Sequence, residues 1–159
     1  MIKLVRVDHR LIHGQVVVSW IRALEPSAIL VANDSIPGDE LRKSTLRLAK
    51  PDDVKLVIKT IDDSIEAISS GKTDTYRLLI LTETVADAVR LADACPAIDH
   101  INLGGTKRLA GTEPLTHTVN LTPDDAAALR GLVARGVEVE ARAVASDRKT
   151  TLPAAGRNA

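Results

Sequence analysis

Aromatic side chains are almost absent from this chain of 159 residues, in which Trp20 and Tyr76 are the only two. The hydrophobic core must therefore be built mainly from Leu, Val, Ile and Ala. Proteins that hold single-stranded nucleic acid usually stack the bases on aromatic side chains, so that mode of binding has no platform here. An excess of charge of one sign is also missing, because 21 Lys and Arg residues balance 21 Asp and Glu residues. This balance argues against nucleic acid or an anionic membrane surface as the main partner.

Cysteine and long apolar runs are scarce as well. Cys95 is the single cysteine, so an intramolecular disulfide is impossible and a reducing cytoplasm is the compartment that we expect. The sequence has no run of about 18 apolar residues that would cross a membrane, and no charged-then-apolar leader at its start. At this length we expect a single domain.

Short apolar runs rich in Val, Ile and Leu alternate with stretches whose apolar residues have helical spacing. The runs predict strands at residues 2–7, 28–32, 54–58, 77–81, 98–103, 117–121 and 137–143. The stretches between them predict helices at residues 15–24, 38–49, 62–70, 84–94 and 123–134. This order indicates an α/β fold with a doubly wound open sheet, mainly parallel, of about seven strands with helices on both faces.

The end of the chain differs in pattern from its beginning. The last two runs, 117–121 and 137–143, alternate between apolar and polar residues, so we expect them near an edge of the sheet. The segment 146–159 is polar and broken by Pro and Gly. We therefore expect one domain over residues 1–145, followed by a loosely attached polar tail.

Two helix starts can be assigned from capping residues. Thr122 is expected to cap the helix that begins at Pro123, because proline is favoured at the first helical position. Asp62 or Asp63 is expected to cap the helix predicted at residues 62–70.

Polar residues cluster where the predicted strands end. Open α/β sheets bind ligands beyond the carboxyl ends of their parallel strands, so these clusters mark the expected site. The clusters are Asp8-His9-Arg10 with His13-Gly14, Asn33-Asp34-Ser35, Thr82-Glu83-Thr84 and Gly104-Gly105-Thr106-Lys107. Histidines, a cation, hydroxyls and a glycine pair suit a phosphate better than a hydrophobic ligand. Asn33-Asp34 and the glycine pair are also ordinary turn sequences, so both interpretations of them stay open.

His13 differs from the other three histidines because Gly14 and a predicted helix near Gln15 follow it directly. A phosphate on its imidazole would face free backbone N–H groups and the positive end of the helix dipole. Arg10 could donate two parallel hydrogen bonds to phosphate oxygens, and Asp8 could orient the arginine or a histidine nitrogen. On these residues alone, a structural histidine in a loop is the alternative.

A metal site is another interpretation of His9 and His13. They are four residues apart and would share one face of a helix, but the segment is predicted to be a loop. No Cys or carboxylate cluster completes a ligand set, and the H-E-x-x-H motif is absent. We therefore expect no metal and no cofactor.

Residues 5–16, V-R-V-D-H-R-L-I-H-G-Q-V, closely resemble the N-terminal motif of a known family. The family is that of the IIB components of the mannose/fructose/sorbose family of the bacterial phosphoenolpyruvate-dependent sugar phosphotransferase system. The segments V-V-S-W, A-N-D-S and N-L-G-G resemble the same family, and the resemblance covers about residues 1–145. Thr106-Lys107 departs from it, because an apolar residue often follows the glycine pair, and Ala145 stands where we expect a proline.

The resemblance implies roles for the residues of the motif. The family's histidine before G-Q is phosphorylated on Nδ1 by a IIA partner, and that position is His13 here. The phosphoryl group would then pass to a sugar held by the membrane IIC and IID components, which makes the protein a protein-histidine phosphotransferase. Asp8 and Arg10 match the motif and are expected to support the phosphate, whereas His9 stands at a variable position and receives no shared role. The other residues expected to support the phosphate are Gly14, Gln15, Gly104 and Gly105.

The resemblance also implies a cytoplasmic phosphoryl carrier that associates peripherally with the membrane transporter and could form a homo-oligomer. Two other classes remain. A receiver-like signalling module would need an acceptor Asp after the third predicted strand, where the chain has Lys59-Thr60 instead. A sugar-phosphate- or nucleotide-binding α/β enzyme would use Gly104-Gly105 as its phosphate cradle. The sequence does not identify the sugar.

Overall fold

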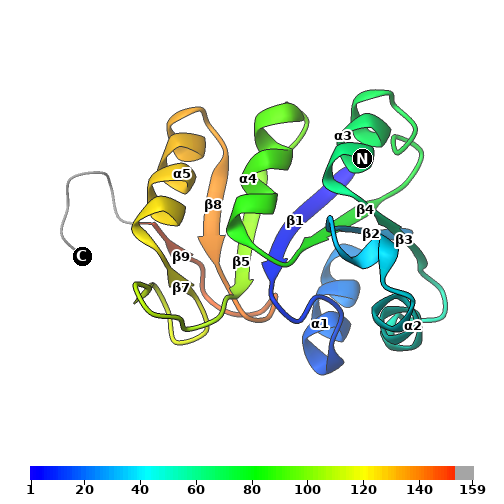
Figure 1. Ribbon diagram of the computed structural model, residues 1–159, viewed down its shortest axis with the longest axis horizontal. Coiled ribbons are helices and arrows are strands. Elements are labelled where there is room, and N and C mark those ends of the chain that lie inside the picture. The colour runs from blue at the N-terminus through cyan, green and yellow to red at the C-terminus, as the bar shows by residue number, and fades with distance from the viewer. Residues whose placement is uncertain (153–159) are drawn as a thin grey trace.

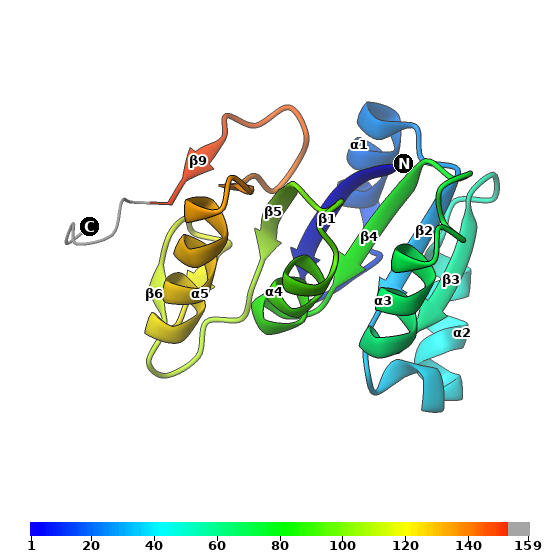
Figure 2. The same ribbon diagram turned by 90° about the horizontal axis from the view of Figure 1, so that it is seen from above.

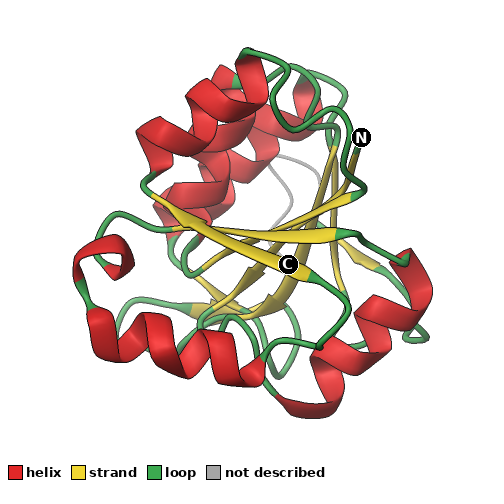
Figure 3. Cartoon of the chain, turned by 90° about the vertical axis from the view of Figure 1, so that its right-hand side faces the viewer, coloured by secondary structure: helices red, strands yellow, loops and turns green. Residues whose placement is uncertain are grey.

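The computed structural model describes residues 1–152, except for the side chains of residues 15 and 16. A seven-stranded sheet lies between two layers of helices (Figure 3). The strand order is β3-β2-β4-β1-β5-β8-β9, so β1 lies at the centre between β4 and β5 (Figure 1). The described strands of this sheet pair in parallel except for β9. The predicted α/β fold with a doubly wound, mainly parallel sheet is confirmed.

The elements are close to those expected from the sequence. The strands of the large sheet are β1 (Ile2–Asp8), β2 (Ala28–Ala32), β3 (Lys55–Lys59), β4 (Leu78–Thr82), β5 (His100–Gly105), β8 (Glu138–Ala141) and β9 (Thr150–Thr151). The helices are α1 (Gly14–Leu24), the short 3-10 helix η1 (Ile36–Gly38), α2 (Glu40–Ala49), α3 (Ile61–Ser69), α4 (Val85–Ala94) and α5 (Pro123–Ala134).

Two apolar clusters fill the spaces between the sheet and its helices. The cluster beneath α3, α4 and α5 contains Leu30 and Ile80, whereas the cluster beneath α1 and α2 contains their neighbours Ile29 and Leu79. Successive side chains of a strand point to opposite faces of a sheet. β2 and β4 are therefore buried along their whole length, and apolar except for Thr82 at the end of β4, as expected of strands covered on both faces.

The prediction of a main-sheet strand at residues 117–121 is wrong. Only Asn120–Leu121 is extended there; it forms β7 and pairs antiparallel with β6 (Glu113–Pro114) in a separate two-stranded sheet. Val119 and Leu121 are nevertheless buried, because they pack in the cluster that α5 also covers. The apolar residues of this segment are therefore explained by burial under a helix and not by pairing in the large sheet.

The seventh strand of the large sheet comes from the segment 146–159, which the sequence predicts to be a loose tail. Thr150–Thr151 forms β9 and pairs antiparallel with β8, at the end of the sheet opposite β3 (Figure 2). The sheet thus continues past the predicted domain boundary at residue 145. A two-residue edge strand needs only a few backbone hydrogen bonds, so it leaves no apolar pattern in the sequence. Residues 153–159 of the predicted tail lie outside the described residues.

One of the two predicted helix caps is correct. The hydroxyl of Thr122 accepts a hydrogen bond from the backbone N–H of Asp125 at 3.0 Å, and Pro123 follows it at the first helical position. For α3 the predicted cap is wrong, because the Thr60 hydroxyl accepts from the Asp63 N–H at 3.1 Å. The helix begins one residue before the prediction since Ile61 is fully buried, which moves both aspartates into its first turn.

Candidate functional site

The loop between β1 and α1 carries the histidines and is anchored by two apolar residues. Leu11 and Ile12 are buried in the cluster beneath α1 and α2. The backbone N–H of Leu11 donates to the carbonyl of Asp8 at 2.9 Å and closes a tight turn. Leu11 has a φ of 57°, which is unusual for a non-glycine residue and is imposed here by the surrounding contacts. The loop is therefore fixed to the core at its middle, and His9 and His13 flank the anchor.

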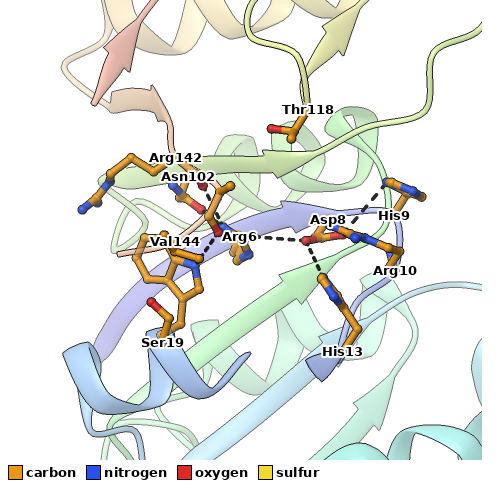
Figure 4. Close-up of polar contacts among 12 residues, drawn as sticks. Arg6, Asp8, His9, Arg10, His13, Ser19, Asn102, Thr118, Arg142 and Val144 are labelled. Carbon is orange, nitrogen blue, oxygen red and sulfur yellow. Dashed lines mark hydrogen bonds and ion pairs between the residues drawn. The ribbon is translucent and has the colours of Figure 1, made fainter. Parts of the chain in front are cut away.

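Asp8 is the centre of the polar contacts in this loop, and its carboxylate is fully buried (Figure 4). Its Oδ2 accepts from Nη2 of Arg6 at 3.0 Å and lies 3.0 Å from Nε2 of His13. Its Oδ1 accepts from the backbone N–H of Arg10 at 3.0 Å. Burial acts to raise the pKa of Asp8, but the hydrogen bonds from His13 and from the Arg10 backbone, together with the Arg6 charge, outweigh it and lower that pKa. Asp8 is thus an anion at neutral pH.

The contact with Asp8 sets the tautomer of His13. A carboxylate only accepts hydrogen bonds, so Nε2 of His13 must carry the proton. In the neutral imidazole the lone pair is then on Nδ1, which makes no hydrogen bond within the described part of the chain. The His13 side chain is 22% exposed, so a reacting partner can reach it. The buried anion thus holds Nε2 and leaves the lone pair of Nδ1 free.

His13 also stands at the start of α1, where it is the N-cap residue with an extended backbone. Its side chain makes no capping hydrogen bond, and the first turn of the helix holds no acidic residue. The other described α-helices are each capped by a side chain, from Asp39, Thr60, Thr84 and Thr122. The first N–H groups of α1 are therefore left for an acceptor from outside the helix, as at anion-binding helix termini.

Gly14 and Gln15 are the first residues of α1. Gly14 has a φ of +41°, and a Cβ built on it would meet no atom within 4 Å. A side chain is therefore disfavoured there by the backbone conformation, while the space beside the helix start is open. The side chain of Gln15 lies outside the described part of the structure. Only its backbone N–H, in the first turn of α1, is therefore considered as a phosphate-supporting group.

Gly104 and Gly105 are buried residues of β5 and make room for the side chains around Asp8. A Cβ on Gly104 would lie 2.1 Å from Cζ of Arg6, so only glycine leaves space for this guanidinium. A Cβ on Gly105 would lie 3.4 Å from Oδ1 of Asp8 and 3.6 Å from Nδ1 of His9. The glycine pair is thus not an open turn, because it lies directly against the network that holds Asp8.

Arg6 is a site residue that the sequence analysis missed. It is 2% exposed, and besides Asp8 it donates to Oδ1 of Asn102 at 2.6 Å and to the carbonyls of Arg142 and Ala143 at 3.0 and 2.9 Å. Burial lowers the pKa of Arg6, and the neighbouring Asp8 opposes that effect. The guanidinium therefore links the carboxylate beneath His13 to strand β5 and to the segment that follows β8.

Glu140 continues this network away from the loop. It accepts from Nδ2 of Asn102 at 3.1 Å, from Nε and Nη2 of Arg142 at 3.0 and 2.9 Å, and contacts Nε2 of His100 at 2.9 Å. Burial acts to raise the pKa of Glu140, but these hydrogen bonds and the charge of Arg142 lower it to about 2. Arg6 and Arg142 also lie over the Trp20 ring, with Cζ 5.1 and 4.9 Å from its centroid.

The sequence contains a signal for this network, namely single polar residues inside buried strands. The signal can be recognised only when the strand register is known. Arg6 pairs with Asn102 across β1 and β5, and Asn102 pairs with Glu140 across β5 and β8. Each is a polar residue inside an otherwise buried strand. Three such residues in one row across three neighbouring strands indicate a buried hydrogen-bonded ladder.

The other polar clusters at the carboxyl edge have structural roles. Oδ1 of Asn33 accepts from the backbone N–H groups of Ser35 and Ile36 at 2.9 and 3.0 Å, and Oδ1 of Asp34 accepts from the N–H of Ile61 at 2.9 Å. The Thr84 hydroxyl caps α4. For Asn33 and Asp34 the turn interpretation is therefore the correct one.

No group of three His, Cys, Asp or Glu side chains within residues 1–152 is placed to hold a metal ion. Of the helices in that part of the chain, none combines the length and the apolar character needed to cross a membrane.

Comparison with known proteins identifies the family. Residues 2–155 match the family described as the PTS system sorbose subfamily IIB component. The chain belongs to this IIB family. A probable phosphotransferase enzyme IIB component of Streptococcus pyogenes serotype M6 is 33% identical over 138 residues, which are 84% of this chain and 85% of that protein. The PTS system mannose-specific EIIAB component of Escherichia coli K12 is 32% identical over 149 residues, which are 94% of this chain and 46% of that longer protein.

The likeness extends to solved structures. The IIBSor domain of the sorbose permease from Klebsiella pneumoniae has a TM-score of 0.89 to this chain at 30% identity, covering 95% of this chain and 93% of that domain. The family predicted from residues 5–16 and the fold predicted from the alternation of strands and helices are confirmed. The protein is a IIB component of the phosphotransferase system, a phosphoryl-transfer domain, and neither a receiver-like module nor an unrelated sugar-phosphate enzyme.

Proposed function

We propose that His13 accepts a phosphoryl group on Nδ1 from a IIA partner and passes it to a sugar during uptake. The observation that carries this proposal is the 3.0 Å contact between Nε2 of His13 and the buried Asp8. It leaves Nδ1 as the free nucleophilic nitrogen, beside the uncapped start of α1. The membrane IIC and IID components are the proposed sites of the sugar, and the protein acts in the cytoplasm beside them.

The transfer exchanges one N–P bond for another. The lone pair on Nδ1 of His13 attacks phosphorus, and the bond to the donor nitrogen breaks with its electron pair returning to the donor. Nε2 keeps its proton throughout, and the negative charge of Asp8 stabilises the phosphorylated imidazole. Little covalent machinery is needed, because in-line positioning and charge stabilisation dominate phosphoryl transfer.

Two kinds of donor would stabilise the phosphoryl oxygens. The Arg10 side chain is 49% exposed, and its Nε makes a 3.4 Å contact with Asp8, so its terminal nitrogens can turn to an incoming phosphate. The backbone N–H groups of Gly14 and Gln15 have no acceptor within the helix, because they lie in its first turn. We propose these groups as the phosphate-supporting set, with Gly104 and Gly105 acting indirectly by making room for the Asp8 network.

A IIA partner is supported by one relative in particular. The Escherichia coli relative is named a mannose-specific EIIAB component, and this chain matches less than half of it. We propose that the donor to this chain is a protein or domain of the same kind as the A part of that relative. We propose that other components of the transporter determine which sugar is carried.

Phosphate uptake by histidine variants tests the proposal. Wild-type protein incubated with phosphorylated IIA should acquire one acid-labile phosphate, as phosphohistidine is acid-labile. His13→Ala should acquire none. His9→Ala should still be labelled, because Nδ1 of His9 lies 4.0 Å from Oδ1 of Asp8 and makes no hydrogen bond to it. Both variants should keep the fold, which circular dichroism would verify. Labelling of His13→Ala together with loss of labelling in His9→Ala would show that the assignment is wrong.

A further inference from the structure

A pocket of about 490 Å³ lies at the carboxyl edge of the sheet, over the ends of β1 and β5. Three segments of the chain line it, and the side chains used below are His9, Arg10, Lys107, Arg108, His117 and Thr118. His13 is not among its lining residues, and Figure 4 shows His13 on the other side of Asp8 from His9 and Thr118. The pocket therefore adjoins the proposed phosphoryl site through Arg10 but is separate from it.

The basic side chains of this pocket are not neutralised. Within residues 1–152, Lys107 and Arg108 make no ion pair, and Arg10 pairs only through its 3.4 Å contact with Asp8. Asp8 is itself shared with two other side chains, and no carboxylate lines the pocket. A concave surface lined by charge of one sign focuses its field and attracts ligands of the opposite sign.

The other half of the same edge, over β2, β3 and β4, is arranged differently. Arg42 there pairs with Glu83, and Arg90 pairs with both Asp34 and Asp62. Arg42 and Arg90 are thus paired with carboxylates on one half of the edge, whereas Lys107 and Arg108 on the other half make no ion pair within residues 1–152. This contrast within one molecule marks the unpaired half as the half that meets an anion.

His9 adds a second observation on the pocket wall. Its Nδ1 is buried and has no hydrogen-bond partner among the described residues, and the nearest carboxylate oxygen, Oδ1 of Asp8, is 4.0 Å away. The His9 side chain as a whole is 29% exposed, so its ring contributes to the pocket wall. His117 and Thr118 provide further polar groups on the opposite wall.

We infer that this pocket binds a small phosphate monoester of the sugar phosphate class. Arg10, Lys107 and Arg108 provide the cations for the phosphate, and His117 and Thr118 provide partners for hydroxyl groups. Pockets of about 300–1,000 Å³ hold ligands of this size, and no Phe, Tyr or Trp lines this pocket to stack on a nucleotide base. That the ester is a sugar phosphate rests on the proposed function, because a carrier that phosphorylates a sugar meets this product. That the pocket takes a phosphate monoester rests on the pocket alone.

Titration of the ¹⁵N-labelled protein by NMR tests this inference. Hexose 6-phosphate should shift the resonances of residues 106–109 and 117–118, and the unphosphorylated hexose should not. Inorganic phosphate should bind at least about tenfold more weakly than the hexose phosphate, because it lacks the hydroxyl contacts. Equal affinity for the two phosphates would overturn the assignment to a sugar phosphate.

A pair of double variants isolates the pocket. Lys107→Ala/Arg108→Ala should weaken hexose phosphate binding at least about tenfold, since each lost charged hydrogen bond reduces affinity. The control Arg47→Ala/Arg148→Ala removes the same charge from exposed residues elsewhere and should bind within about twofold of wild type. Equal affinity of the two double variants would overturn the inference. Binding to phosphatidylglycerol vesicles that depends on Lys107 and Arg108, without binding of the soluble ester, would also overturn it.

His13→Ala separates this inference from the proposed function. This variant should bind hexose phosphate as wild type does, because His13 does not line the pocket. Loss of binding in His13→Ala would place the ligand at the phosphoryl site and overturn the separate pocket. Uptake of phosphate from IIA by the same variant would instead contradict the proposed function and leave the pocket result unchanged.

Discussion

At the scale of single residues, the site combines a fixed carboxylate, that of Asp8, with a half-exposed cation, the guanidinium of Arg10. Asp8 is fully buried and shared by Arg6, the Arg10 backbone and His13. The side chain of Arg10 is half exposed and makes only one long contact with that carboxylate. Asp8 therefore fixes the histidine, and under the proposed transfer the half-exposed Arg10 side chain would be free to move onto a phosphate.

Arg10→Lys should slow phosphoryl transfer without unfolding the protein. Lysine keeps the charge but lacks the two parallel donors that fit phosphate oxygens. We expect single-turnover transfer from phosphorylated IIA to fall about 10²–10³-fold, the usual loss for a pre-placed donor. The free energy of unfolding should change by about 1 kcal/mol or less, because the ion pair with Asp8 is half exposed.

The matched control for this variant is Arg47→Lys, which changes an exposed arginine that does not contact Asp8. Its transfer rate should stay close to that of wild type. A wild-type rate in Arg10→Lys itself would show that Arg10 is structural and that the start of α1 stabilises the phosphate.

At the scale of secondary-structure elements, the β1–α1 loop joins a buried strand to an uncapped helix. Leu11 and Ile12 pin the loop to the core, and His13 ends it in an extended conformation. The apolar pair inside a polar motif is explained by this packing. Its position between the two histidines could be predicted from the sequence, but the left-handed backbone of Leu11 could not, because leucine rarely adopts it.

Gly14→Val should lower the transfer rate by more than its loss of stability explains. A β-branched residue is strained at a φ of +41°, which should cost about 1–3 kcal/mol of unfolding free energy. The new side chain would also occupy the open space beside the first N–H groups of α1, so we expect transfer to fall about 10²-fold, as when one oxyanion donor is lost.

Gly136→Val is a suitable control for that variant. Gly136 also has a positive φ, +94°, with no atom within 4 Å of an added Cβ, but it follows α5 on another part of the molecule. It should lose similar stability and keep its transfer rate. Equal effects of the two variants on transfer would mean that Gly14 serves only the turn.

Across the whole molecule, a polar ladder runs from the site to the last parallel strand. Arg6, Asn102 and Glu140 face one another across β1, β5 and β8, and Asp8 joins the ladder to His13. Buried polar groups of this kind stabilise a fold only when all are satisfied. The ladder thus ties the position of His13 to the stability of the sheet.

Glu140→Gln should make the protein less stable and less sensitive to acid. The pKa of Glu140 is lowered from 4.5 to about 2, so its contribution is fully present above about pH 4.5 and is lost as the pH falls towards about 2. A shift of this size corresponds to about 3 kcal/mol at neutral pH. Urea unfolding of wild type and variant should therefore differ by about that amount at neutral pH, and the difference should shrink in acid.

Glu138→Gln is the control on the same strand. Glu138 is 47% exposed and pairs with Lys149 at the surface, so its loss should change the unfolding free energy by about 1 kcal/mol or less at any pH. A difference between Glu140→Gln and wild type that stays constant in acid would contradict the titration of Glu140.

The sequence predicted the parallel sheet, five α-helices and the family motif, because these depend on local periodicity and on contiguous residues. It did not predict the hydrogen-bonded network of Arg6, Asn102 and Glu140. Arg6 and Asn102 are nearly a hundred residues apart in the sequence, and the three residues meet only through the strand register. The strand at Thr150–Thr151 was missed because edge pairing leaves no apolar signature. The segment 117–121 was misassigned because burial under a helix and burial in a sheet select the same residues.

The Nδ1 atom of His13 as phosphoryl acceptor, with Nε2 held by Asp8, is tested most directly by two-bond ¹H–¹⁵N NMR of the histidine-labelled protein. Spectra recorded before and after phosphorylation by IIA distinguish the two ring nitrogens. We predict that neutral His13 carries its proton on Nε2, and that the phosphorylated protein carries phosphate on Nδ1 of His13 with Nε2 still protonated. A proton on Nδ1 in the neutral form, or phosphate on Nε2 or on another histidine, would contradict the role of Asp8 and the proposed transfer.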